Sequence, residues 1–233
     1  MLKEWGNRYM QIAIDGPVGS GKSTISRELA KRLGIVYVDT GALYRAVGLY
    51  CKNNGVSVDD ESGVRELIGD GLKLEIKLIN GTQRVFANGN DVSGLIRSPE
   101  VSMLASDVSR LPYVRRFLLD IQRDIAKNNS VVMDGRDIGT VILPDADVKI
   151  YLTANDTARA RRRYDELAEK GQDIDFNDVL ADLKKRDFND MNRETAPLKQ
   201  AEDAILIDST LLTFKQTADK IYGIITAFMA SSY

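Results

Sequence analysis

Five short runs of the chain are mostly apolar, and stretches with apolar residues at three- and four-residue spacing lie between most of them. Short apolar runs are typical of strands buried on both faces, and the longer spacing indicates amphipathic helices. Their alternation predicts an α/β fold with a five-stranded parallel sheet and helices on both faces. The predicted strands are residues 9–15, 35–39, 130–134, 148–152 and 204–208, and the predicted helices are 22–33, 41–54, 60–68, 112–127, a segment from about 155, and 213–229.

A period-two pattern interrupts this series. From Leu72 to Leu78, leucine or isoleucine at every second position alternates with lysine or glutamate, which predicts a strand with one apolar face. Asn80-Gly81 is a strong hairpin signal, 83–87 fits the returning strand, and Asn88-Gly89 indicates another turn. Ser98 followed by proline predicts the start of a helix. We therefore expect a small antiparallel sheet set between helical segments, as an insertion into the parallel fold.

The charge balance argues against polyanionic partners. The 233 residues hold 32 Lys and Arg against 34 Asp and Glu, a net charge of −2, whereas a general binder of nucleic acid or anionic membrane is expected to be basic. No apolar run approaches the length of a membrane span. Residues 1–8 are polar and lack the apolar centre of a signal peptide. We expect a short N-terminal extension, a cytoplasmic location, no nucleic-acid or membrane partner, and a monomer.

Two residue counts exclude whole classes of chemistry. The chain has no histidine and one cysteine, Cys51. These counts exclude a histidine base or metal ligand, an internal disulfide and a cysteine-cluster zinc site. Cys51 is expected to pack within a helix as a small apolar residue. Phosphoryl transfer is compatible with these counts, because it depends on positioning and positive charge more than on proton chemistry.

Residues 16–24 fit G-x-x-x-x-G-K-[ST], the phosphate-binding P-loop. The loop follows a predicted strand and opens a predicted helix, as this motif requires. Its glycines let the backbone direct N–H groups inward, and the helix N-terminus adds partial positive charge. We expect Lys22 to reach the β- and γ-phosphates of ATP and the Ser23 hydroxyl to lie near Mg²⁺. The predicted ATP-binding residues are Gly16, Pro17, Val18, Gly19, Ser20, Gly21, Lys22, Ser23 and Thr24.

Charged residues also gather after the predicted strands, at the sheet edge where open parallel sheets bind ligands. Arg45 follows the second strand, and Arg136 and Asp137 follow the third between two glycines. Arginines share helix faces within 159–163 and 186–193 by three- and four-residue spacing. From these spacings alone, three interpretations stay open: solvated surface, nucleic-acid contact, and a lid that closes positive charge over phosphate.

Six motifs, in one order, resemble those of the bacterial cytidylate kinases, the long form of the nucleoside monophosphate kinases. A P-loop alone occurs in many families, whereas the ordered set is specific. The likeness runs from Ile12 to about the last predicted helix, and the pattern from Leu72 to Ala87 fits the insertion of the long form. The motifs are GPVGSGKST at 16–24, DTGALYR at 39–45, DVSGLIRSPEVS at 91–102, DGRDIGTVILPDA at 134–146, RDFNDMNRETAPL at 186–198 and DST at 208–210.

The resemblance implies a role for each matched residue. Ser106, Arg115 and Asp137 would read the cytosine of the acceptor, with the carboxylate accepting from the cytosine amine. Arg159 and Arg163 would be exposed residues of a lid helix and act on the closed complex. The implied CMP-binding residues are Thr40, Tyr44, Arg45, Ser106, Arg115, Arg136, Asp137, Arg186 and Asp190, and the implied catalytic residues are Lys22, Arg136, Arg159, Arg163 and Arg193.

The resemblance therefore implies a kinase that moves the γ-phosphoryl group of ATP to CMP or dCMP with the help of Mg²⁺. A P-loop kinase of another small acceptor, such as UMP or shikimate, is one alternative. A P-loop ATPase or switch protein is another, although the chain lacks the N-K-x-D motif of GTPase switches. We expect one P-loop kinase domain over 1–233, with a core at about 9–39, 128–153 and 203–230, an acceptor-binding insertion at about 40–127 and a helical lid at about 154–193.

Overall fold

The central sheet has the parallel arrangement that the apolar runs predict. The computed structural model of the chain describes residues 9–79 and 81–231, so the predicted extension 1–8 and Asn80 of the predicted hairpin turn lie outside the described residues. The five strands of the sheet are all parallel, in the order β2-β6-β1-β7-β8. They are β1 (Gln11–Asp15), β2 (Val36–Asp39), β6 (Val131–Gly135), β7 (Val148–Thr153) and β8 (Ile205–Asp208).

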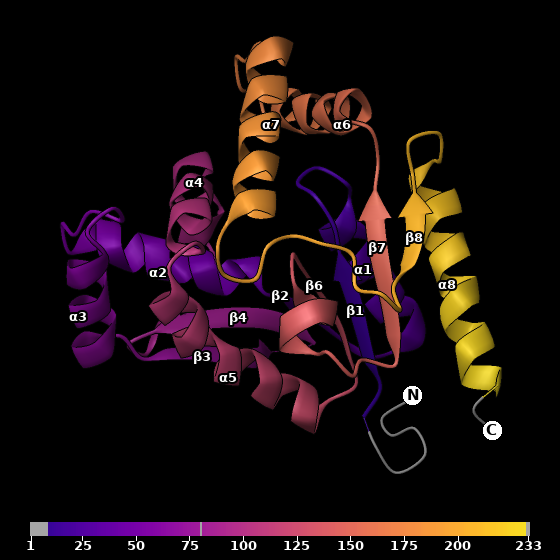
Figure 1. The fold of residues 1–233 in the computed structure, drawn as a ribbon, viewed down its shortest axis with the longest axis horizontal. Coiled ribbons are helices and arrows are strands. Elements are labelled where there is room, and N and C mark those ends of the chain that lie inside the picture. Colours follow the sequence, from indigo (N-terminus) through magenta and orange to yellow (C-terminus); the bar gives the residue numbers. More distant parts are fainter. Residues whose placement is uncertain (1–8, 80, 232–233) are drawn as a thin grey trace.

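Successive side chains of the strands enter two apolar layers, one on each face of the sheet. Ile12 packs into a cluster with α1 (Lys22–Leu33) and α8 (Phe214–Ser231). Ala13, the next residue, packs into a second cluster that includes the end of α5 (Pro112–Asn128). Helices therefore cover both faces of the sheet (Figure 1), and the predicted fold class is confirmed.

The helices of the predicted lid begin at side-chain caps. Asn155 precedes α6 (Asp156–Glu169) and Asp175 precedes α7 (Phe176–Asn192), and each cap side chain accepts a hydrogen bond from a first-turn N–H. Both helices lie beyond the carboxyl end of β7, above the sheet in Figure 1. Of the helices in the part of the chain that the structure describes, none is long and apolar enough to span a membrane.

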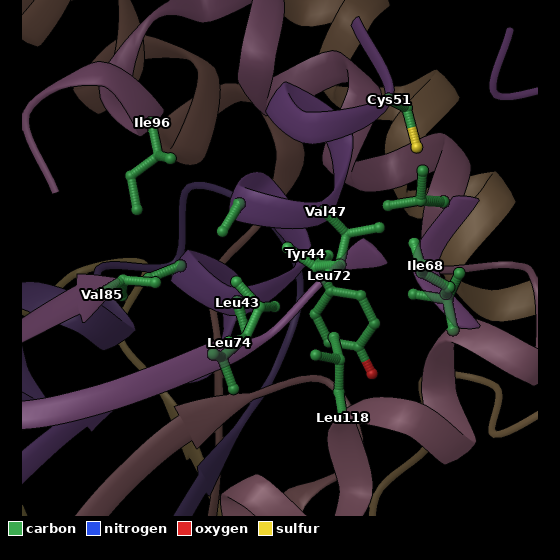
Figure 2. Close-up of a cluster of buried hydrophobic side chains, with 14 of the residues drawn as sticks. Leu43, Tyr44, Val47, Cys51, Ile68, Leu72, Leu74, Val85, Ile96 and Leu118 are labelled. Carbon is green, nitrogen blue, oxygen red and sulfur yellow. The ribbon is translucent and has the colours of Figure 1, made fainter. Parts of the chain in front are cut away.

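The segment between β2 and β6 holds a small antiparallel sheet, as predicted, and has an apolar core of its own. Figure 2 shows part of this core, including Leu43, Val47 and Leu118. Cys51 is a free, buried thiol on α2, as expected. Before α5, the elements of the insertion are α2 (Gly41–Asn53), α3 (Glu61–Gly71), β3 (Leu74–Ile79), β4 (Thr82–Ala87), β5 (Asn90–Asp91), η1 (Leu95–Arg97) and α4 (Pro99–Val108).

Three short elements were not predicted, and one of them is the 3-10 turn η1. β5 adds a third antiparallel strand after the turn at Asn88 and Gly89, whose φ values of 49° and 81° are left-handed. A π-helical turn, η2 (Ile138–Ile142), follows β6. None of the three elements is long enough to show a hydrophobic period in the sequence, because each spans at most five residues.

Candidate active site

The P-loop joins β1 to α1 and folds around its own lysine. Gly16 has a φ of 149°, and a Cβ at this position would lie 2.0 Å from the Leu152 carbonyl oxygen, so only glycine fits. Lys22 is 5% exposed, and its Nζ donates to the Pro17 carbonyl at 2.7 Å. Burial, and next the positive charge of Arg136, lower the pKa of Lys22. An anion held by the loop would stabilise this charge.

Asp134, at the end of β6, lies beside the start of α1. Its carboxylate accepts from Ser23 Oγ at 2.8 Å and from the Tyr37 hydroxyl at 2.9 Å. Burial, and next the negative charge of Asp39, raise the pKa of Asp134 to about 6. A carboxylate whose ionisation is disfavoured in this way is stabilised by a cation brought close to it.

The Ser23 hydroxyl and the Asp134 carboxylate together offer oxygen ligands at the start of α1. Mg²⁺ takes oxygen ligands and commonly combines one or two carboxylates with substrate phosphates and water. No group of three or more His, Cys, Asp or Glu side chains that could hold a metal occurs among residues 9–79 and 81–231. The pair fits a Mg²⁺ ion that shares its coordination with nucleotide phosphates.

Asp15, at the end of β1, holds the loop that follows β6. Its two carboxylate oxygens accept from the backbone N–H groups of Ile138 at 2.8 Å and Gly139 at 2.7 Å. Burial raises the pKa of Asp15 to about 6, although the two N–H donors act in the opposite direction. Because Ile14 is the register partner of Asp134, Asp15 points to the opposite face of the sheet from Asp134.

Five charged residues from three segments form a continuous series of ion pairs, which we call the arginine–aspartate network. Arg136 Nε donates to Asp190 at 2.8 Å, and Asp190 lies 3.7 Å from Arg193 Nη1. Arg193 Nη2 lies 3.3 Å from one oxygen of Asp137, whose other oxygen accepts from Arg115. The structure therefore brings together five predicted site residues that come from α5, from the loop after β6 and from the end of α7.

Positive charge exceeds negative charge at the network. Burial, and next the charge of Arg136, lower the pKa of Arg186 on α7. Burial, and next the charge of Arg115, lower the pKa of Arg193. The Arg115 guanidinium also lies over the Tyr44 ring, 5.6 Å from its centre. Arginines packed closely enough to disfavour one another's charge are suited to bind an anion.

Three other predicted acceptor residues lie outside the network. Thr40 Oγ1 donates to the Asp134 carbonyl at 2.8 Å. Arg45 pairs at 2.7 Å with the last residue of β2 and lines a cavity of about 280 Å³ beside α1 and β4. Ser106 lies on α4, where its carbonyl accepts from Ser109 Oγ at 2.8 Å. Within residues 9–79 and 81–231, no hydrogen bond or ion pair joins these three side chains to the network.

Arg159 is buried, so the expectation that it is an exposed lid residue is wrong. Only 3% of it is exposed. Its guanidinium donates to the carbonyls of Val18 at 2.9 Å and Ala154 at 2.8 Å, and it pairs with both Asp187 and Asp156. The helix spacing gave no sign of this burial, because the carboxylate of Asp187 comes from another helix 28 residues further along the chain.

Arg163 lies on α6 one turn further along and is partly exposed. Its side chain is 32% exposed and pairs with Glu166 at 2.8 Å. Together with Arg186 and Ser102 it lines a cavity of about 620 Å³ between α4, α6 and α7. This cavity is large enough for a small ligand.

Comparison with known proteins identifies the family. The sequence model of the cytidylate kinase family matches residues 12–227. The chain belongs to the cytidylate kinase family. It is 51% identical to the cytidylate kinase of Caldicellulosiruptor saccharolyticus, over 92% of this chain and 94% of that protein. It is 52% identical to that of Caldicellulosiruptor bescii, over 92% and 94%, and 49% identical to that of Carboxydothermus hydrogenoformans, over 93% and 97%.

Three aspartates of this cytidylate kinase family member lie in the site, although no role was predicted for them. Asp15 is the last residue of β1 and Asp134 is the second-last residue of β6. An acid at the carboxyl end of an apolar run is a signal that could have identified both. Asp187, which contacts the P-loop, had no such signal. It lies next to Arg186 in a charged helix, where solvated acids are common.

Proposed function

We propose that the chain transfers the γ-phosphoryl group of ATP to CMP or dCMP, giving ADP and CDP or dCDP. Membership of the cytidylate kinase family supports this function. The observation that carries the proposal is the buried pairing of Arg115 with Asp137 among several arginines. Such a pair offers a hydrogen-bond donor and an acceptor for the edge of a base, next to positive charge for a phosphate.

Residues 16–24 bind the triphosphate of ATP in this proposal. The N–H groups of the loop and the start of α1 stabilise phosphate oxygens, and the Lys22 ammonium neutralises charge on the transferring group. Ser23 and Asp134 would hold Mg²⁺. When bound, Mg²⁺ supplies charge neutralisation to the phosphate oxygens. The buried setting of Lys22 supports its catalytic role, because a charge in a dry site acts strongly on a neighbouring anion.

The arginine–aspartate network binds the acceptor. Asp137 accepts from the cytosine amine, and Arg115 donates to an acceptor atom of the ring. Arg136 and Arg193 stabilise phosphate charge, which the acceptor and the donor both carry. Arg186 and Asp190 hold the sugar, and Thr40, Tyr44, Arg45 and Ser106 complete the acceptor site.

Movement of two segments relative to the core completes the site. We assign 40–127 to the acceptor-binding insertion and 154–193 to the lid, around a core of 9–39, 128–153 and 203–230. The separate apolar core of the insertion supports this division. The 620 Å³ cavity between α4, α6 and α7 is the space that closure would reduce. Closure would bring Arg163 towards the phosphates and exclude water from the reaction.

An ADP-release assay with ATP and Mg²⁺ tests this function. The acceptors to compare are CMP, dCMP, UMP and shikimate, with a reaction that lacks any acceptor. We expect kcat/KM for CMP or dCMP to exceed that for UMP by about tenfold or more, because one polar group of the base is mismatched. Equal ADP release without an acceptor would overturn the kinase proposal in favour of an ATPase. The highest kcat/KM with UMP or shikimate would reassign the acceptor.

A further inference from the structure

Asp187 of α7 and Arg159 of α6 hold one residue of the P-loop, Val18, through its backbone N–H and its carbonyl. One oxygen of the Asp187 carboxylate accepts from the Val18 backbone N–H at 3.1 Å, and the other accepts from Arg159 Nη1. The same Nη1 donates to the Val18 carbonyl at 2.9 Å. Asp187 is 8% exposed and Arg159 is 3% exposed. We call this arrangement of Val18, Arg159 and Asp187 the P-loop clasp.

Packing next to the clasp leaves the loop little room to move separately from α6 and α7. Gly19 has a φ of 73°, and a Cβ there would lie 3.2 Å from both the Arg159 carbonyl oxygen and Leu183 Cδ1. Close-packed contacts of this kind transmit a displacement instead of absorbing it. In Figure 1, α6 and α7 stand above the loop that joins β1 to α1. A shift of these helices therefore acts on the backbone that surrounds Lys22.

The same turn of α7 also reaches the acceptor side. Asp190, three residues after Asp187, pairs with Arg136 at 2.8 Å. Arg186, the residue before Asp187, lies near enough to Arg136 for that charge to lower its pKa. Residues 186–190 thus contact the P-loop through Asp187 and the arginine–aspartate network through the neighbouring residues Arg186 and Asp190.

We propose that Asp187 is a positioning residue that couples the acceptor site to the ATP site. This inference rests on the proposed kinase function. A ligand that displaces the Arg136–Asp190 pair shifts α7, and Asp187 transmits this shift to the backbone of Val18. CMP then strengthens the binding of ATP, and ATP strengthens the binding of CMP by the same factor. Asp187 contacts neither substrate in this role.

The test compares Asp187→Asn with Asp165→Asn, a matched control. Asp165 lies on α6, its side chain is 51% exposed, and it pairs with Arg161 at 3.0 Å, so the control removes the same charge from the outer surface of the lid. The measurement is the Kd of a non-hydrolysable ATP analogue by calorimetry, with and without saturating CMP. The ratio of the two Kd values is the coupling factor.

We expect the parent and the control to share a coupling factor of about five or more. In the Asp187→Asn variant the factor should fall towards one, and kcat should fall roughly ten- to a hundredfold because the loop is misplaced. If Asp187 had a merely structural role, its replacement would raise both Kd values and lower the Tm. The ratio of the two Kd values would then stay unchanged. A parental coupling factor in the folded Asp187→Asn variant would overturn the proposal, as would a factor of one in the parent.

A second measurement does not depend on the identity of the acceptor. Hydrogen exchange of the Val18 amide reports the clasp directly, since its N–H donates to Asp187. We expect faster exchange at Val18 in Asp187→Asn and Asp187→Ala, with the N–H groups of β1 unchanged. Unchanged exchange at Val18 in the Asp187→Ala variant would contradict the clasp. If CMP fails to bind the parent, the proposed function is wrong. The hydrogen-exchange result then still tests whether the P-loop clasp exists.

Discussion

Arg115 and Asp137 form a buried ion pair that ties α5 to the loop after β6, with 8% and 5% of their side chains exposed. The carboxylate of Asp137 is shared with Arg193, 3.3 Å away. Arg115 also donates to the Ser109 carbonyl at 3.1 Å, so its guanidinium is oriented from two sides. These contacts fix the direction of one acceptor and one donor before any base is present, which favours recognition of a planar polar edge.

Asp137→Asn should narrow the preference for CMP over UMP. Cytosine presents an amine to the carboxylate, whereas uracil presents a carbonyl oxygen, and an unpartnered buried polar group costs about 1–3 kcal/mol. The asparagine amide can donate to uracil, so the ratio of kcat/KM values should fall by roughly five- to a hundredfold. Asparagine is preferable to alanine here because it keeps an oxygen for Arg115 and Arg193. An unchanged ratio would show that the base is read by other residues.

Arg115→Ala serves as the companion variant for this measurement. Both pyrimidines keep the carbonyl oxygen next to the sugar linkage, so the loss of the guanidinium should reduce kcat/KM for CMP and UMP alike. The variant also leaves Asp137 with one fewer cation, and a lower Tm is expected. A loss confined to CMP would contradict the assignment of Arg115 to the shared carbonyl.

Lys22→Ala should lower kcat by roughly a hundred- to a thousandfold with a smaller rise in KM for CMP. Its ammonium is directed at charge that grows during transfer, so its removal affects the transition state more than the ground state. The fold should survive, because burial and Arg136 already disfavour the charge of Lys22 in the free protein. Steady-state kinetics with unfolding curves checks both expectations. A folded variant with near-parental kcat would remove Lys22 from the mechanism.

Local patterns predicted the parts of the fold that depend on neighbouring residues. The strand that enters the P-loop and the helix from Lys22 to Leu33 lie where predicted, since apolar periodicity and the glycine motif report the local backbone. The order of the strands is a tertiary property and needed the structure. The two-residue β5 and the single turn η2 are too short to carry a period.

Long-range pairing explains the errors at the site. The spacing of Arg159 on an amphipathic helix is the same for a solvated and for a buried arginine. What buries Arg159 is Val18, 141 residues earlier, and Asp187, 28 residues later. Neither contact leaves a trace in the sequence around Arg159. The members of the network from Arg115 to Arg193 could be predicted as site residues through the family resemblance, whereas spacing could not bring them together, because they come from three distant segments.

Arg159→Ala and Arg163→Ala should differ in stability although both should lower kcat. Arg159 makes two ion pairs and two hydrogen bonds to carbonyls while buried, and breaking a buried pair costs about 3–5 kcal/mol. Arg163 has one pair, with Glu166, and its removal should change stability by about 0.5 kcal/mol or less. Chemical unfolding curves and kcat values of both variants test this expected difference in stability. Equal losses of stability would show that the surroundings of the two arginines are alike in solution.

Asp15→Asn should change how stability depends on pH. The pKa of Asp15 is raised from 3.8 to about 6 in the folded protein, chiefly by burial. The folded state therefore binds the extra proton between these values, and Asp15 lowers stability as pH rises from about 4 to about 7, by about 3 kcal/mol. The asparagine variant lacks this titration. It should be less stable than the parent at pH 4, because one N–H of Ile138 or Gly139 loses its acceptor.

The free energy of unfolding of both proteins, measured by urea from pH 4 to pH 7.5, tests this expectation. The parent should lose its advantage over the Asp15→Asn variant as pH rises, because only the parent must ionise a buried carboxyl. The difference between the two proteins is informative, since titrating groups far from Asp15 contribute equally to both curves. A constant difference across this range would mean that Asp15 titrates in the folded protein as it does in the unfolded chain. Water would then reach its carboxylate despite the two backbone donors.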